Sequence, residues 1–236
     1  MKNLKTNVLV LFSVFVIIGI SSFKNPNKKE FFPKLSAYCN SLSKEFVNIP
    51  IERKAELKDI ADFVIEQRKE GKPANLLFVC TSNSRRSHMA QVWAQIASYH
   101  YNVDSVFTFS GGTEQTRVNI NAIDALTRTG IEIYSNNQGD NPLRYLKVGS
   151  KINPWVIFSK KYTDSTNPNS NFAAIMVCSE ADKECPFVLG ATSRIGMPYK
   201  DPKEFDNSPL KAAKYDERCK QIATEMFYMM ELVSKK

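Results

Sequence analysis

The stretch LLFVCTSNSRRSHM at residues 76–89 constrains the fold more than any other part of the chain. A short apolar run ends at Cys80, a loop of small polar residues follows, and Ser87 opens a segment with helical periodicity. A buried strand that turns directly into a helix is typical of the beginning of a β–α–β unit. The stretch therefore predicts a parallel sheet with a polar loop at the carboxyl end of one strand.

The rest of the chain continues this alternation. Strands are expected at 76–79, 105–109, 172–177 and 194–198, with an extra strand at 155–159, and helices at 87–99, 119–129 and 208–233. Residues 31–70 have apolar residues at helical spacing and predict a helical extension that packs on the main domain. We therefore expect an α/β fold with a parallel four-stranded sheet, helices on both faces and an N-terminal helical extension. We expect three parts: a signal peptide at 1–23, a linker and helical extension at 24–74, and a catalytic domain at 75–236.

The loop after the first strand has the composition of an oxyanion site. Successive backbone N–H groups and the free amides of the following helix can hold an anion, and the planar fork of Arg86 can bind two of its oxygens. The same positive field is expected to lower the pKa of Cys80, while Ser87 hydrogen-bonds its sulfur and Asn83 fixes the loop. The candidate oxyanion-binding residues are Thr81, Ser82, Asn83, Ser84, Arg85 and Ser87. The alternative is a buried core cysteine followed by a surface arginine.

Two other segments are expected to reach the same edge of the sheet. Cys80, Ser110 and Cys178 all occur where a strand is predicted to end. Asp201, before Pro202, could protonate a leaving oxygen, although an Asp-Pro pair is also common in ordinary turns. Cys178 and Cys185 would be separated by roughly 10.5 Å along an intact helix, so a disulfide between them requires the segment to unwind. Two inert buried thiols are the alternative.

Charge and cysteine content exclude several other classes of function. The 236 residues have a net charge of +8, but no basic stripe interleaved with aromatic residues indicates nucleic-acid binding. Five cysteines without regular spacing argue against a disulfide framework, and two histidines without a C-x2-C pair give little support for a metal site. We expect neither a metal nor a cofactor.

The first residues have the features of a secretory signal. Two lysines precede an apolar run at 8–20, which is followed by small residues and is shorter than the ~20 residues that span a bilayer. We expect cleavage after about residue 23, export to the periplasm and no stable membrane insertion afterwards. A cytoplasmic or N-terminally membrane-anchored protein is the alternative.

These motifs together resemble the low-molecular-weight protein tyrosine phosphatase superfamily, and most closely its thioredoxin-coupled arsenate reductases. CTSNSRRSHMA is similar to the reductase loop Cys-Thr-Gly-Asn-Ser-Cys-Arg-Ser-Gln-Met-Ala, with Ser82 in place of the glycine and Arg85 in place of the second cysteine. SGGTEQTRVNINAIDAL resembles the second strand and helix, VCSEADKECP the segment with two redox cysteines, and KDP the acid loop. The resemblance covers roughly residues 75–235.

The resemblance implies a role for each matching residue. Cys80 would be the nucleophile, Arg86 the oxyanion clamp and Asp201 the general acid. Cys178 would attack the arsenic adduct of Cys80, and Cys185 would then form a disulfide with Cys178 that a thioredoxin-like reductant reduces.

Three functions are compatible with the sequence: an arsenate reductase, a phosphatase acting on phosphotyrosine or small phosphoesters, and a non-catalytic oxyanion-binding module. The residues after Asp201 are Lys203, Glu204 and Phe205 rather than the adjacent tyrosines typical of the phosphatases, which weakens the phosphatase interpretation. An oxidising compartment outside the inner membrane weakens the reductase interpretation, because recycling needs a reductant. For an enzyme, we expect the substrate to be arsenate or a phosphoester.

Overall fold

The computed structural model describes residues 29–135, 139–184 and 187–236. The predicted signal peptide at 1–23 lies outside the described residues, and so does Cys185. In the part of the chain that the structure describes, every helix is too short or too polar to span a bilayer.

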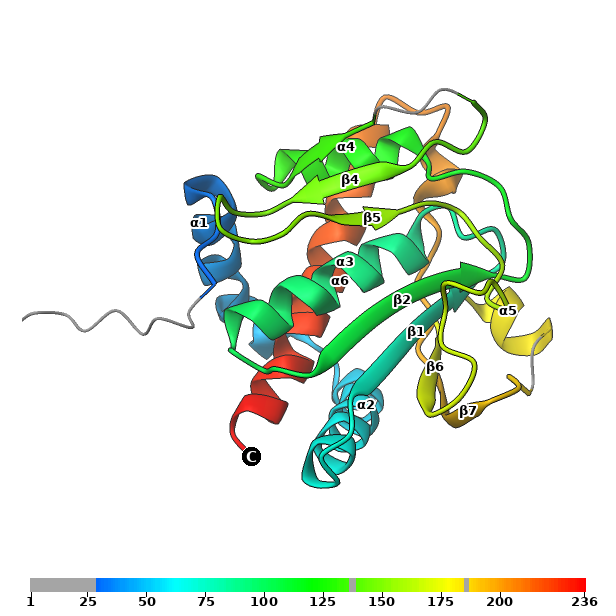
Figure 1. Ribbon diagram of the computed structural model, residues 1–236. Helices are drawn as coiled ribbons and strands as arrows, with labels where there is room; N and C mark the ends of the chain where they lie inside the picture. Colours follow the sequence, from blue (N-terminus) through cyan, green and yellow to red (C-terminus); the bar gives the residue numbers. More distant parts are fainter. Residues whose placement is uncertain (1–28, 136–138, 185–186) are drawn as a thin grey trace, which may run out of the picture.

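A four-stranded parallel sheet forms the centre of the molecule (Figure 1). Strand β1 (Ala74–Cys80) lies between β2 (Val106–Gly112) and β6 (Phe172–Met176), and β7 (Ala191–Gly196) is the edge strand next to β6. Every side chain of β6 is buried, as expected for a strand covered on both sides. The predicted α/β class with a parallel four-stranded sheet is confirmed. Among the strands of this sheet, the largest differences from the predicted bounds are in two: β2 continues through Gly112 instead of ending at residue 109, and β7 begins at Ala191 instead of residue 194.

The α-helices that follow β1 pack on the sheets or on one another. Helix α3 (Arg86–His100) contacts β1 and β2, and it packs on the long C-terminal helix α6 (Lys211–Ser234). Helix α4 (Ile120–Arg128) also lies against α6, whereas the short helix α5 (Ser179–Glu184) contacts β1 and β6 where these strands end. The apolar side chains of β1, α3 and α6 are almost completely buried and form one core. A large contiguous apolar core of this kind is the main source of the fold's stability.

A second, antiparallel sheet follows α4. It contains β3 (Glu132–Tyr134), β4 (Arg144–Lys147) and β5 (Trp155–Ile157). Only β5 was predicted, because β3 and β4 are short and mostly polar, with little alternation of apolar residues. The chain leaves this sheet and passes beside the loop that follows β1, so this insertion reaches the predicted site.

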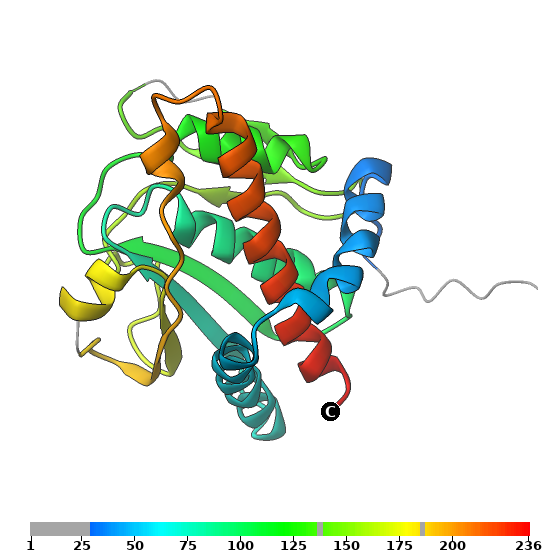
Figure 2. The ribbon, with the colours of Figure 1, turned by 180° about the vertical axis from the view of Figure 1, so that it is seen from behind.

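The predicted helical extension is confirmed. It consists of α1 (Pro33–Leu42), the 3-10 helix η1 (Ser43–Asn48) and α2 (Ile51–Lys69). The extension passes across the lower part of α6 in Figure 2, and α2 also contacts β1 and β7. Gly130 allows a close approach to α1: its φ of +106° suits glycine, and a Cβ there would lie 2.6 Å from the backbone nitrogen of Leu35.

Candidate functional site

The candidate nucleophile is the last residue of β1. Cys80 is 3% exposed, and its Sγ lies 3.1 Å from Oγ of Ser87 in the first turn of α3. The loop at 81–85 joins the strand to the helix in the space of five residues. The sulfur therefore lies at the carboxyl end of a central strand and next to the amino end of a helix, which is where anions bind in sheets of this type.

A directed chain of hydrogen bonds ends at this sulfur. The backbone N–H of Lys160 donates to Oδ1 of Asn83 at 2.8 Å, which fixes the orientation of the Asn83 amide. Nδ2 of Asn83 donates to Oγ of Ser87 at 2.9 Å, so the hydroxyl proton of Ser87 is left to donate to Cys80. Asn83 has a φ of +41°, a left-handed conformation that Asn tolerates better than most residues. The predicted roles of Asn83 and Ser87 agree with this geometry.

A buried histidine supports the loop from behind. Nε2 of His88 donates to the carbonyl oxygen of Asn83 at 2.9 Å, and Nδ1 accepts from Oγ of Ser110 at 3.2 Å. A carbonyl can only accept, so Nε2 carries the proton. Complete burial, with the charge of Lys160 as a second cause, lowers the pKa of His88 to about 3, and the ring is therefore neutral at ordinary pH. The ring holds Asn83 in its left-handed conformation.

Burial dominates the titration of the nucleophile. Removal of Cys80 from water raises its thiol pKa above the ordinary value, while the Ser87 hydroxyl, the Arg86 charge and the amide of Ser84 act in the opposite direction. A nearby Cys178 thiolate would raise this pKa further. The prediction of a lowered pKa for Cys80 was therefore wrong for this state: the expected donors are present, but desolvation exceeds their combined effect.

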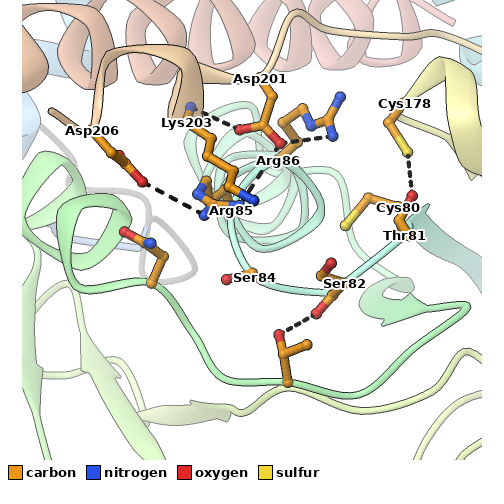
Figure 3. A network of polar contacts seen from close by, with 12 residues as sticks. Cys80, Thr81, Ser82, Ser84, Arg85, Arg86, Cys178, Asp201, Lys203 and Asp206 are labelled. Atoms are coloured by element: carbon orange, nitrogen blue, oxygen red, sulfur yellow. Dashed lines mark hydrogen bonds and ion pairs between the residues drawn. The ribbon is translucent and has the colours of Figure 1, made fainter. Parts of the chain in front are cut away.

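The predicted clamp and the predicted acid are in contact. Nη2 of Arg86 lies 2.8 Å from a carboxylate oxygen of Asp201, and Nη1 donates to the carbonyl of Tyr199 at 2.8 Å. The other oxygen of Asp201 accepts from the amide of Lys203 at 3.0 Å, which caps the 3-10 helix η2 (Pro202–Phe205). Figure 3 shows Asp201 above the loop with its carboxylate directed at Arg86. An oxyanion bound by the Arg86 fork would take the place of this carboxylate.

Arg85, the last residue of the loop, points toward the acid loop and α6. Nε of Arg85 donates to the hydroxyl of Tyr215 at 3.0 Å, and that hydroxyl donates to Asp206 at 2.7 Å. The two terminal nitrogens of Arg85 lie 3.8 Å from Asp201 and from Asp206 (Figure 3). Arg85 therefore links the oxyanion loop to the acid loop, and this link was not foreseen.

The remaining loop residues anchor the loop through polar contacts. Oγ of Ser84 donates to the carbonyl of Arg117 at 2.7 Å, and the carbonyl of Ser82 accepts from Oγ1 of Thr116 at 2.7 Å. Gly112 lies against this loop, and a Cβ there would come within 2.5 Å of the Thr81 carbonyl oxygen. The backbone of the loop is thus fixed on several sides, while its role in binding an oxyanion stays a prediction.

Cys178 lies beside the nucleophile. It follows β6, which pairs with β1, and its Sγ is 3.5 Å from Oγ1 of Thr81, the residue after Cys80. Figure 3 shows Cys178 and Cys80 on the same side of the loop. Cys178 is fully buried, and α5 begins at the next residue, so the segment between Cys178 and Cys185 is helical as far as Glu184.

Sequence reasoning missed several residues that shape the site. They are His88, Lys160, Tyr199, Asp206 and Tyr215, whereas Ser110 was expected at this edge of the sheet but not as the partner of His88. His88 follows Ser87 directly and Tyr199 precedes Asp201 by two residues, so proximity to the motif was the one available signal. Among the described residues, no group of three or more His, Cys, Asp or Glu side chains could hold a metal ion.

Comparison with known proteins identifies relatives of this chain. An arsenate reductase from Staphylococcus aureus is 33% identical over 128 residues, which are 54% of this chain and 77% of that protein. An arsenate reductase from Bacillus cereus is 28% identical over 150 residues, or 63% of this chain and 92% of that protein. No family model matches the chain.

Solved structures of phosphatases resemble it more weakly. A low-molecular-weight phosphotyrosine phosphatase from Vibrio cholerae gives a TM-score of 0.47 at 13% identity, covering 67% of this chain and 95% of that one. An arginine phosphatase from Geobacillus stearothermophilus gives 0.41 at 15%, covering 67% and 92%. The assignment rests on the sequence relatives together with the site: the chain belongs to the arsenate reductase family, and it is a cysteine-nucleophile enzyme.

Proposed function

We propose that this enzyme reduces arsenate to arsenite through a relay of three thiols. The observation that supports the relay best is the position of Cys178, whose sulfur lies against Thr81 at the end of the strand next to that of Cys80. A simple hydrolase would need only Cys80, Arg86 and Asp201, and Cys178 would have no part in its chemistry.

The first step forms a bond between sulfur and arsenic. The Cys80 thiolate attacks arsenic, one As–O bond breaks, and Asp201 in its protonated form gives its proton to the oxygen, which leaves as water. Arg86 binds two of the remaining oxygens, which requires Asp201 to leave the guanidinium that it contacts in this structure. Ser87 stabilises the thiolate by donating to it.

The second and third steps move the disulfide outward. The Cys178 thiolate attacks the sulfur of Cys80, an S–S bond forms, and the S–As electron pair stays on arsenic, which leaves as arsenite. Cys185 then attacks Cys178 and releases Cys80 as a thiolate. The protein has lost two electrons and arsenic has gained two, so a thioredoxin-like dithiol must reduce the Cys178–Cys185 disulfide.

The aromatic side chains near the acid loop favour a small oxyanion over an aryl phosphate as the substrate. The two tyrosines near the acid loop are already engaged: Tyr199 donates its hydroxyl to Glu225 at 2.7 Å, and Tyr215 is bonded to Arg85 and Asp206. The ring of Phe205 is covered by Lys214, whose ammonium group lies 5.3 Å from the ring centroid.

We also propose that the enzyme is exported, so its reductant would work outside the inner membrane.

Turnover of single-cysteine variants tests this proposal. Arsenate-dependent oxidation of a thioredoxin system is expected in the wild type and lost in Cys185→Ser, which keeps any hydrolysis of a phosphomonoester. Cys219→Ser is a matched control, because the serine oxygen can still accept the hydrogen bond that Trp93 donates to Cys219. Unchanged arsenate turnover in Cys185→Ser would eliminate the relay. Phosphomonoester hydrolysis that needs Cys80 but no thioredoxin, in a protein inert to arsenate, would identify a phosphatase.

A further inference from the structure

One side chain of the N-terminal extension reaches the backbone of the acid loop. Arg53 lies in the first turn of α2, is 15% exposed, and donates from Nη2 to the carbonyl of Pro198 at 2.7 Å. Its guanidinium lies over the ring of Tyr199, 5.0 Å from the centroid. Arg53 therefore contacts Pro198 and Tyr199, which lie three and two residues before Asp201 in the chain.

Two carboxylates hold this guanidinium in place, the partly exposed one of Glu56 and the buried one of Glu225. Nη1 of Arg53 lies 2.8 Å from Glu56 on the same helix, and Nε lies 3.6 Å from Glu225 on α6. Glu225 also accepts the hydroxyl of Tyr199, so Arg53 and Tyr199 share one partner. Only a planar fork with several donors can serve a carbonyl, two carboxylates and an aromatic face together, and a lysine ammonium cannot.

Tyr199 links this cluster to the catalytic groups. Its side chain is fixed between Arg53 and Glu225, and its carbonyl oxygen accepts from Nη1 of Arg86. Arg86 in turn contacts Asp201, two residues further along the chain. A shift of the Tyr199 backbone would thus move the acceptor that orients the clamp and would also move the acid.

We propose that Arg53 is a positioning residue for the oxyanion site, through which the N-terminal extension sets the geometry of both Arg86 and Asp201. This inference rests on the proposed roles of Arg86 and Asp201, but not on arsenate being the substrate. The N-terminal extension then positions residues of the site, in addition to packing on the core.

The test compares Arg53→Lys with Arg68→Ala in the full-length chain. Arg68 is an exposed arginine in the last turn of the same helix and serves as the matched control. Affinity for inorganic phosphate is measured by calorimetry, and kcat and KM are measured with whichever oxyanion substrate the wild type turns over. Because phosphate binding needs only the oxyanion site, it tests Arg53 even if arsenate reduction itself is disproved.

For Arg53→Lys we expect a five- to tenfold loss of phosphate affinity and a fall of about tenfold in kcat, which corresponds to about 1.4 kcal/mol. The melting temperature of Arg53→Lys should change little, since lysine keeps the positive charge and the aliphatic part of the side chain. Arg68→Ala should match the wild type in all of these measurements. Arg53→Met provides a second variant in which the same two losses should be larger. Unchanged phosphate affinity and kcat in folded Arg53→Lys overturns the proposal, and so does a loss confined to the melting temperature in both variants.

Discussion

Among the described residues, Ser87 is the one side chain that donates a hydrogen bond to Cys80, and Ser87→Ala removes this donor. The direction of the proton is fixed, because Ser87 accepts from Asn83 at 2.9 Å and therefore donates to the sulfur 3.1 Å away. A hydrogen bond to a charged acceptor contributes about 1.5–3 kcal/mol. At about 1.4 kcal/mol per unit, the Ser87→Ala substitution should raise the pKa of Cys80 by about one to two units.

The substitution also has a predictable effect on rate. Burial already raises the pKa of Cys80, so at neutral pH each further unit lowers the thiolate fraction about tenfold. We expect kcat/KM at pH 7 to fall roughly 10- to 100-fold and to recover partly as pH rises toward the new pKa. The thiolate is measured by its ultraviolet absorbance as a function of pH, as the difference between each protein and its Cys80→Ser counterpart.

Ser98→Ala is the matched control for this experiment. Ser98 lies on the same helix, is buried, and donates to the backbone carbonyl of Gln95. This control should leave the Cys80 titration where it is in the wild type. A folded Ser87→Ala protein with the wild-type titration curve would refute the reasoning, since it would mean that the hydroxyl does not donate to the sulfur.

Two further substitutions test the support of the loop. His88→Ala leaves the Asn83 carbonyl and the Ser110 hydroxyl without their partner, and should lower the free energy of unfolding by about 2–5 kcal/mol in urea titrations. Because the pKa of His88 is about 3 when folded and near 6.5 when unfolded, its neutral form stabilises the protein above pH 6.5, and this contribution is lost as pH falls from there toward 3. The melting temperature of His88→Ala should therefore depend less on pH in that window, and an identical dependence would contradict the assignment. Gly112→Ala places a methyl group against backbone carbonyls, so we expect the free energy of unfolding to fall by about 1–3 kcal/mol and phosphate to bind more weakly. If calorimetry gives the wild-type phosphate affinity for this variant, the loop can move without affecting the site.

Much of the site could be predicted because parallel strands end at one edge of a sheet. Cys80 ends β1, Cys178 follows the neighbouring strand β6, and Asp201 follows the edge strand β7, so identifying three strand ends was enough to bring them together. The spacing between Cys80 and Arg86 placed the guanidinium at the start of α3, and its contact with Asp201 was found only in the structure. The assignment of Cys185 stays a prediction.

Other features depend on distances that periodicity does not contain. The contact between Arg53 and Pro198 joins residues 145 positions apart, and nothing in either segment indicates the other. The pKa of Cys80 depends on how completely the loop closes over the sulfur, because desolvation competes with donors that the sequence does reveal. Short strands such as β3, with two of its three residues exposed, leave almost no apolar pattern to detect.

The position of the acid loop explains why an extension would be useful to this fold. β7 is an edge strand, so the loop that follows it has a sheet neighbour on one side only. Helix α2 packs against β7, and Arg53 supplies a donor to the loop's Pro198 carbonyl. In the proposed mechanism Arg86 exchanges Asp201 for an oxyanion, and the backbone carbonyl of Tyr199 is the acceptor that can keep its guanidinium oriented during the exchange. By fixing Tyr199 from outside the sheet, Arg53 would therefore keep the Arg86 guanidinium in place when Asp201 moves away from it.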